Sequence, residues 1–489
     1  FARGFRQNLF GIFLQDDFKL TPRLTLNLGV RYEFVTSPEE VNGKTANLRN
    51  IIGTGPNPTD LGVGDTFFET PKGGIAPRFG FAYDVTGDGK TAVRGGFGIY
   101  YEQPLFSSYR QAAYGTLPFV NTARLRNATG NAPTLLPVPG SAFVGGTPLT
   151  ETLAFDLQEI YVMQYNLNVQ REFLGTVLSA AYVGSRGVNL LGQGDINTSI
   201  GQVLPDGRVM FDGNRRNPNF DVVRSGIQGF NSWYNSMNLG AARRFNQGLQ
   251  FQLSYTFGRS IDERSGIAGR QEFLNGQSRT LDPYNRALDK GRSDFDVRHS
   301  FVANATYDLP FGKFVSGVPK YILDDWQINS IVTISSGVPF GVFVDGDPDM
   351  DGTDENAARP DLIAGANLYP VGGSTPDLWF DPNAFAAPQI GFRGTAGRNI
   401  LVGPNFRSVD LGMSKIFRVD EKRSLQFRVE AFNLFNRANF DLPANADDGS
   451  LIFTGSNFQL APNVGRIFNT VPLQQGDARE FQLALKFLF

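Results

Sequence analysis

Apolar and polar residues alternate with a period of two along much of this chain, and this pattern restricts its fold more than any other feature. From residue 24 to residue 34 the even positions read Leu, Leu, Leu, Val, Tyr and Phe, and the odd positions read Thr, Asn, Gly, Arg and Glu. Such a segment forms a β-strand with one apolar and one polar face. Thirteen segments of this kind are predicted, at about residues 7–19, 24–34, 78–85, 93–101, 158–172, 175–190, 232–245, 249–257, 295–310, 322–336, 404–418, 423–436 and 479–489.

The length of these segments indicates a membrane. At ~3.3 Å per residue and a tilt of about 40°, a strand of about ten to thirteen residues crosses roughly 25 to 30 Å. Strands of soluble proteins average about half that number of residues. No stretch approaches the ~18 apolar residues of a spanning helix, but strands whose alternate residues are polar cross a membrane without one.

Short and long connections alternate between the predicted strands. The short ones carry Gly, Pro, Asn or Asp, as hairpin turns require, and lie at 19–23, 86–90, 172–175, 245–248, 311–325 and 419–423. The long ones lie at about 38–74, 104–157, 191–231, 263–294, 340–403 and 437–477. Outer-membrane barrels have short periplasmic turns and longer extracellular loops, whereas a soluble sandwich or propeller has no reason to sort its connections. The sequence therefore predicts an all-β, antiparallel transmembrane β-barrel in the outer membrane of a bacterial cell.

The last strand, residues 479–489, follows a long connection and is therefore predicted to descend and to end at the periplasmic side. Considered alone, it is equally an amphipathic edge strand of a soluble sheet. Its terminal Phe489 resembles the closing-strand signal of outer-membrane barrels, which implies the barrel assembly machinery as a partner. An odd strand number is unlike whole bacterial barrels, and the first residue is not methionine. We therefore expect residues 1–489 to be the C-terminal portion of a longer barrel; removal of a leader peptide is the alternative.

Composition argues against several other functional classes. The chain has no cysteine and one histidine, His299, so it offers no disulfide framework, no thiolate metal site and no histidine relay beyond that residue. A serine such as Ser185 lacks the partners of a catalytic triad. The net charge is −2, and acidic and basic residues are scattered along the chain, so no basic cluster indicates binding to nucleic acid. We expect neither an enzyme nor a nucleic-acid partner, although catalysis by carboxylates alone is left open.

Several segments resemble TonB-dependent receptors. Residues 11–33 resemble a mid-barrel hairpin of that family, and residues 425–440 resemble its penultimate strand. Segments similar to the Oar-like branch, large receptors with an N-terminal carboxypeptidase-regulatory-like domain, lie at 181–187, 293–301, 379–385 and 397–404.

The resemblance implies a barrel of about 22 strands or more with a plug domain inside it. It also implies a periplasmic TonB box that couples to TonB-ExbB-ExbD. None of the plug, the box or the N-terminal domain is found within residues 1–489, so we expect them upstream. The implied function is binding of a large substrate by the long loops and its energised uptake. A structural or adhesive surface barrel is the main alternative, and a passive porin is a third; the substrate stays open.

Charged residues recur on the polar faces of the predicted strands. A barrel too wide to be filled by apolar side chains holds water or a plug, so polar residues are expected to face its lumen. We predict that these charges contact the plug or the substrate; solvated or mutually paired charges are the alternative. The candidates are Arg31, Glu33, Arg78, Arg94, Arg428, Glu430 and Lys486.

The most distinctive local motif is an acidic loop at residues 345–356. From position 347 it reads Asp-Pro-Asp-Met-Asp-Gly, the first half of an EF-hand-type calcium loop. Position twelve of such a loop is a bidentate Glu, but Ala358 stands there. We expect a structural Ca²⁺ that rigidifies the loop, with a solvated acidic turn as the alternative, and no other cofactor. The predicted ligands are the carboxylates of Asp347, Asp349 and Asp351 and the backbone carbonyl of Thr353.

Overall fold

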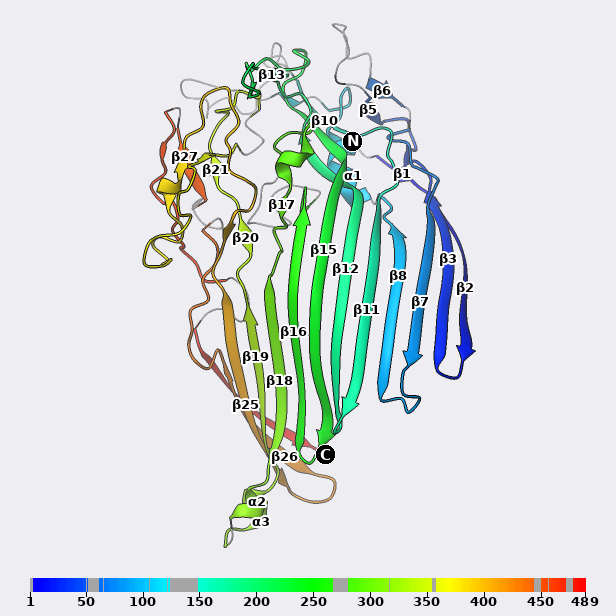
Figure 1. Ribbon diagram of the computed structural model, residues 1–489, viewed down its shortest axis with the longest axis vertical. Helices are drawn as coiled ribbons and strands as arrows, with labels where there is room; N and C mark the ends of the chain where they lie inside the picture. The colour runs from blue at the N-terminus through cyan, green and yellow to red at the C-terminus, as the bar shows by residue number, and fades with distance from the viewer. Residues whose placement is uncertain are drawn as a thin grey trace.

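One large curved sheet dominates the molecule (Figure 1). The computed structural model describes residues 3–49, 51, 61–64, 66–104, 106–120, 122–123, 148–266, 280–315, 317–353, 358–443, 450–455, 457–471 and 478–489. Thirteen long strands lie side by side in chain order, every neighbour antiparallel. They are β2 (Leu9–Thr21), β3 (Leu24–Val35), β7 (Ile75–Asp84), β8 (Thr91–Tyr101), β11 (Tyr161–Phe173), β12 (Thr176–Asp195), β15 (Val223–Asn246), β16 (Leu249–Asp262), β18 (His299–Leu309), β19 (Trp326–Ser335), β25 (Phe406–Arg418), β26 (Ser424–Phe432) and β29 (Glu480–Leu488).

The thirteen predicted strands are confirmed, mostly with boundaries within a few residues. The largest difference is β15, which begins at Val223 instead of the predicted residue 232 because its first residues pair with the end of β12 and with a loop strand, β10 (Pro148–Leu153). The β10–β15 pair is parallel, an arrangement that the sequence did not predict. Within the described residues, β2 and β29 are the two edges of the large sheet.

All six short connections lie at one end of the sheet, which we call the turn end, and the C-terminus lies there too (Figure 1). In two of the hairpins both turn residues have positive φ: Leu174 and Gly175 at 49° and 73°, and Gln247 and Gly248 at 52° and 81°. These are type I′ turns, whose twist matches that of the strands they join. The connection from β18 to β19 differs, because it contains two single-turn helices, α2 (Phe311–Phe314) and α3 (Lys320–Leu323).

The large sheet has one apolar face. Leu28 of β3 pairs with Phe79 of β7, which in turn pairs with Phe97 of β8, and all three side chains are exposed. Each of the thirteen strands contributes at least one exposed apolar side chain to this face: Leu14, Leu28, Phe79, Phe97, Leu167, Tyr182, Met237, Phe257, Tyr307, Ile334, Met413, Phe427 and Leu485. A continuous exposed apolar band on every strand is what contact with lipid requires.

The long connections gather at the opposite end, which we call the loop end (Figure 1). They form a helix, α1 (Phe106–Gly115), and two short 3₁₀ segments, η4 (Arg286–Asp289) and η5 (Pro382–Ala384). No helix in the described ranges is long and apolar enough to cross a membrane. The short strands of this end are β1 (Phe5–Arg6), β4 (Glu39–Glu40), β5 (Ala46–Leu48), β6 (Leu61–Val63), β9 (Thr122–Ala123), β10, β13 (Gln202–Val203), β14 (Val209–Met210), β17 (Gly291–Arg292), β20 (Pro339–Phe340), β21 (Phe343–Val344), β22 (Asp361–Leu362), β23 (Phe385–Ala386), β24 (Leu401–Val402), β27 (Leu451–Thr454) and β28 (Gln459–Leu460).

The buried apolar clusters of the described chain lie at this loop end. The largest joins the connection between β19 and β25 to the one between β26 and β29, and Phe340, Phe380, Leu401 and Ile452 within it have no exposed surface. A second cluster packs Phe67 and Phe68 against α1 and the upper part of β12. Each such side chain contributes about 1.5–3 kcal/mol when it leaves water. The loops are therefore a folded layer with cores of their own.

A charge placed on the apolar face tests its contact with lipid. Leu167 lies at the middle of β11 and is 48% exposed. We expect Leu167→Arg to lower the free energy of unfolding in lipid vesicles by about 2–4 kcal/mol, because a cation at mid-membrane loses its hydration. Asn166→Arg is the matched control, since this neighbouring residue is exposed on the opposite face. Denaturant titrations of the vesicle-inserted protein compare the two, and equal losses would contradict the assignment of the faces.

Candidate functional site

Buried arginines tie the loops at the loop end to one another. Arg359 lies between β19 and β25 and pairs with Asp289 of η4, Nη2 to Oδ1, at 2.6 Å, with both side chains almost fully buried. Arg398 belongs to the same connection and bonds Asp262, at the end of β16, at 2.6 Å and Asp294 at 3.2 Å. Two successive long connections are thereby joined by charges that water cannot screen.

A further pair of arginines continues this network toward the acidic loop. Arg215 pairs with Asp195, at the end of β12, at 3.1 Å and with Asp221 at 2.9 Å. Arg393 donates a hydrogen bond to the carboxylate of Asp282. The partners in this last pair are separated by 111 positions in the chain, so no local sequence pattern could have identified them.

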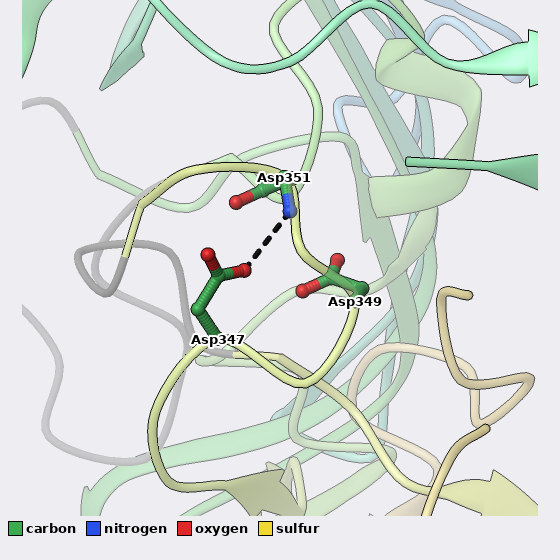
Figure 2. A group of neighbouring side chains, drawn as sticks. All are labelled: Asp347, Asp349 and Asp351. Atoms are coloured by element: carbon green, nitrogen blue, oxygen red, sulfur yellow. Dashed lines mark hydrogen bonds between the residues drawn. The ribbon is translucent and has the colours of Figure 1, made fainter. Parts of the chain in front are cut away.

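The acidic loop, defined here as residues 345–353, brings three predicted ligands together (Figure 2). Asp347 accepts hydrogen bonds from the backbone N–H groups of Asp351, at 2.9 Å, and Gly352, at 3.1 Å, which closes the turn. Asp349 and Asp351 are 4% and 1% exposed. One carboxylate oxygen from each of the three aspartates lies within 4.8 Å of the other two.

Thr353 and Ala358, the other two positions of the predicted motif, hydrogen-bond to residues in and around the acidic loop. Thr353 donates its backbone N–H to Asp351 Oδ1 at 3.1 Å, and its side chain hydrogen-bonds the carboxylate of Asp195. Ala358, at position twelve of the motif, pairs with Val344 through its backbone, where its carbonyl accepts from Val344 N at 2.8 Å. Residues 354–357 of the predicted loop lie outside the described residues.

Backbone hydrogen bonds hold the acidic loop against two neighbouring segments. Ser199 N donates to the carbonyl of Asp351 at 2.6 Å, and Gly213 N donates to that of Met350 at 2.8 Å. Gly391 N donates to the carbonyl of Pro348 at 2.9 Å. The acidic loop is therefore a junction between the connection from β12 to β15 and two parts of the connection from β19 to β25.

The carboxylates of the acidic loop are poorly neutralised. Arg393 Nε lies 3.4 Å from Asp349 Oδ2, and Arg393 Nη2 lies 3.6 Å from Asp351 Oδ2. Burial and, to a smaller extent, the nearby carboxylates of Asp349 and Asp347 together raise the pKa of Asp351 to about 8. Burial also raises the pKa of Asp349 to about 6, although Arg393 opposes the rise. Ionisation of these two carboxyl groups therefore costs more free energy here than in water.

A cavity of about 470 Å³ lies beside this junction. Three arginines line it, and each guanidinium lies over an aromatic ring: Arg208 over Phe392 at 4.5 Å, Arg216 over Tyr284 at 3.7 Å and Arg393 over Phe211 at 4.3 Å. Stacking of this kind holds a guanidinium in place while its edge stays available to donate hydrogen bonds. No local sequence pattern marks this cavity, because its lining comes from positions up to nearly two hundred residues apart.

The seven charges predicted to face the lumen share one face of the large sheet. The pairings Gly29 with Arg78 and Ala82 with Arg94 align the first strands, and the regular stretches of the ladder can be followed from there to Glu430 and Lys486. This is the face opposite the apolar band. The seven do not form one site, because some lie on β3, β7 and β8 and the others on β26 and β29, near the two edges of the sheet.

Most of these charges have partners on the same face. Arg31 pairs with Glu33 at 2.5 Å, and Arg428 pairs with Glu430 at 3.3 Å. The Arg94 guanidinium donates to the side chain of Gln170, and the Arg78 guanidinium lies 4.7 Å from the centre of the Tyr100 ring. His299 is the first residue of β18 and hydrogen-bonds the Tyr255 hydroxyl at 2.8 Å.

A single sheet of long antiparallel strands, with one exposed apolar face, short turns at one end and folded loops at the other, defines an outer-membrane β-barrel protein. The family model described as "Outer membrane beta barrel domain" matches residues 1–482, and the chain belongs to this family. It is accordingly a protein of the bacterial outer membrane.

Comparison with known proteins finds transporters. The chain is 23% identical over 456 residues to the TonB-dependent transporter Oar of Myxococcus xanthus, which covers 87% of this chain and 35% of that protein. Among solved structures, the outer membrane transporter YddB from Escherichia coli aligns with 99% of this chain and 45% of its own, at 10% identity and a TM-score of 0.48. The ferric enterobactin receptor PfeA from Pseudomonas aeruginosa aligns over the same shares at 11% identity and a TM-score of 0.46. The chain thus spans about a third of the length of Oar.

Removal of a buried arginine tests whether ion pairs hold the loop layer together. We expect Arg359→Leu to destabilise the contact between η4 and residues 359–362 by about 3–5 kcal/mol, because Asp289 would be left buried without its partner. Faster amide hydrogen exchange in η4 reports this loss. The control is Arg466→Leu, since Arg466 pairs with Asp377 at 3.2 Å in the same layer but is 47% exposed, so its loss should cost less than about 1 kcal/mol. Similar exchange in both variants would contradict the expectation.

Proposed function

We propose that this chain is the barrel of a receptor that binds a large substrate through its extracellular loops and takes it up with energy supplied through TonB. The observation that supports this most directly is the folded layer at the loop end. Its apolar clusters and buried ion pairs fix the loops before any ligand arrives. A binding surface that is already ordered loses less conformational entropy when it binds, and so binds more tightly.

The polar face of the sheet supports the same proposal. If the apolar band faces lipid, the seven charges on the opposite face line the lumen, where a plug domain or a passing substrate can contact them. Two of the seven, Arg428 and Glu430, already pair with each other. We propose that this pair also interacts with the plug of the complete protein, and that the plug couples to TonB-ExbB-ExbD.

A growth experiment that needs no knowledge of the substrate tests the function. Cells with and without the complete gene, each with and without TonB, are grown in a rich medium whose components are followed by mass spectrometry. We expect at least one component to be depleted only when both the gene and TonB are present. Depletion that needs the gene but not TonB would point to a passive pore. No gene-dependent depletion, together with altered cell adhesion, would point to an adhesive barrel, and either result would overturn the proposal.

Exchange of the two charges tests the contact with the plug. In the complete protein, Arg428→Glu combined with Glu430→Arg keeps the pair but inverts the field that it presents to the lumen. We expect the double exchange to lower substrate uptake and to make the plug more accessible to protease. The control is the double exchange Asp377→Arg with Arg466→Asp, an exposed pair at 3.2 Å in the loops and outside the arginine-lined cavity. If the Arg428→Glu, Glu430→Arg variant took up substrate as the wild type does and its plug were equally resistant to protease, the pair would have a structural role only.

A further inference from the structure

We propose that the acidic loop holds a Ca²⁺ ion through the carboxylates of Asp347, Asp349 and Asp351, and that this ion locks the junction of the extracellular loops. Within the residues that the structure describes, these three form the one group of possible metal ligands of this size. Their oxygens lie within 4.8 Å of one another. Ca²⁺ binds oxygen at about 2.3–2.6 Å, so two ligands on opposite sides of the ion are about 5 Å apart. The three carboxylates therefore already stand at the spacing of a coordination shell.

An unsatisfied oxygen points independently to a missing cation. Asp351 is 1% exposed, and its Oδ2 atom is buried without a hydrogen-bond partner. Its other oxygen accepts from Thr353 N. A buried carboxylate oxygen without a donor costs about 1–3 kcal/mol or more, and native structures rarely tolerate one. The three carboxyl groups gather within one turn of the chain, so a single ion can reach all of them (Figure 2).

Arg393 supplies only part of this missing charge. Its Nε atom lies 3.4 Å from Asp349 Oδ2 and its Nη2 atom 3.6 Å from Asp351 Oδ2, so it is ion-paired with both but donates a well-aligned hydrogen bond to neither. The hydrogen bond that Arg393 does make goes to Asp282. Arg393 is shared with Asp282, and Arg215, which also acts on Asp347, is itself paired with Asp195 and Asp221, so the three acids are only partly neutralised. A divalent ion removes this imbalance, and the arginine supplements it from the outer side.

The chemistry of the site selects calcium. All three side chains offer hard oxygen ligands, and the chain has no cysteine and only His299, so a soft transition metal finds no suitable set. Mg²⁺ requires a near-ideal octahedron at about 2.0–2.1 Å, whereas Ca²⁺ accepts irregular oxygen shells completed by water. The bidentate Glu of an EF-hand is replaced by Ala358, which removes one carboxylate. We therefore expect a Kd of about 0.1–1 mM, the range of extracellular calcium modules.

Such an ion would act on more than its own loop. Asp351 and Met350 accept backbone hydrogen bonds from Ser199 and Gly213, and Pro348 accepts one from Gly391. Without the ion, repulsion among the carboxylates opposes the turn that presents these carbonyls. With it, the turn is stabilised and three loop segments are held together beside the arginine-lined cavity. Calcium would thereby order part of the surface on which a substrate docks, an effect that does not depend on TonB or on uptake.

Calcium titration of the folded protein tests the site. The whole chain, refolded in detergent and freed of metal with a chelator, is titrated with CaCl₂ by calorimetry, and hydrogen exchange is followed in residues 345–353 and 197–215. We expect one binding event and slower exchange in both segments. Asp349→Asn should weaken binding at least tenfold. Asp345→Asn should bind as the wild type does, because this exposed aspartate of the same loop is outside the group of three.

The controls separate binding from folding and from general ionic effects. Asp349→Asn relieves part of the repulsion among the carboxylates, so we expect its exchange without metal to be no faster than that of the wild type; Asp351→Asn repeats the test at the second buried ligand. Absence of heat and of protection in the wild type up to about 10 mM Ca²⁺, well above the expected Kd, would overturn the proposal without any variant. The proposal would also be overturned if MgCl₂ gave the same protection from exchange, or if Asp345→Asn lost the Ca²⁺ response while Asp349→Asn kept it.

Discussion

The ladder of backbone hydrogen bonds across thirteen antiparallel strands is the interaction on which the rest of this protein depends. Inside a membrane no water is available to an unpaired N–H or C=O group, so each strand must lie beside a neighbour that satisfies it. That requirement fixes strand length, antiparallel order and the separation of turns from loops. It also frees the side chains from making a core, because a strand in a barrel wall presents one face to lipid and the other to the lumen.

The buried apolar clusters of the described residues lie in the loops and not between layers of secondary structure. Phe340, Phe380 and Leu401 are enclosed there by segments that belong to two different connections. Arg359 and Arg398 add ion pairs that are buried from water. Buried ion pairs are often no more stabilising than an apolar replacement, but they permit few alternative arrangements of their partners. The loop layer is therefore ordered in a specific way, and its acidic loop and its arginine-lined cavity share Arg393.

Strands and turns could be predicted closely, and the loop end could not. In residues 24–34 successive side chains point alternately to the two faces of the sheet, so the pattern is visible within a few positions of the sequence. The observed strand β3 has almost the same bounds as the predicted one. Helix α1 and the parallel pairing of β10 with β15 were not predicted, since nothing periodic marks them. The grouping of Asp347, Asp349 and Asp351 could be predicted because these residues lie two positions apart in one turn of the chain. Arg393, which approaches them from more than forty positions further along the chain, was not predicted.

The sequence by itself determined which residues form strands, which face of each strand is apolar and at which end the long connections lie. These follow from a period of two and from turn residues, both of which act over a few positions. Only the tertiary structure decided which loop segments meet. Asp282 and Arg393, or Asp351 and Ser199, are brought together by the curvature of the sheet and by packing of the loop clusters, and no short-range pattern encodes contacts between positions so far apart.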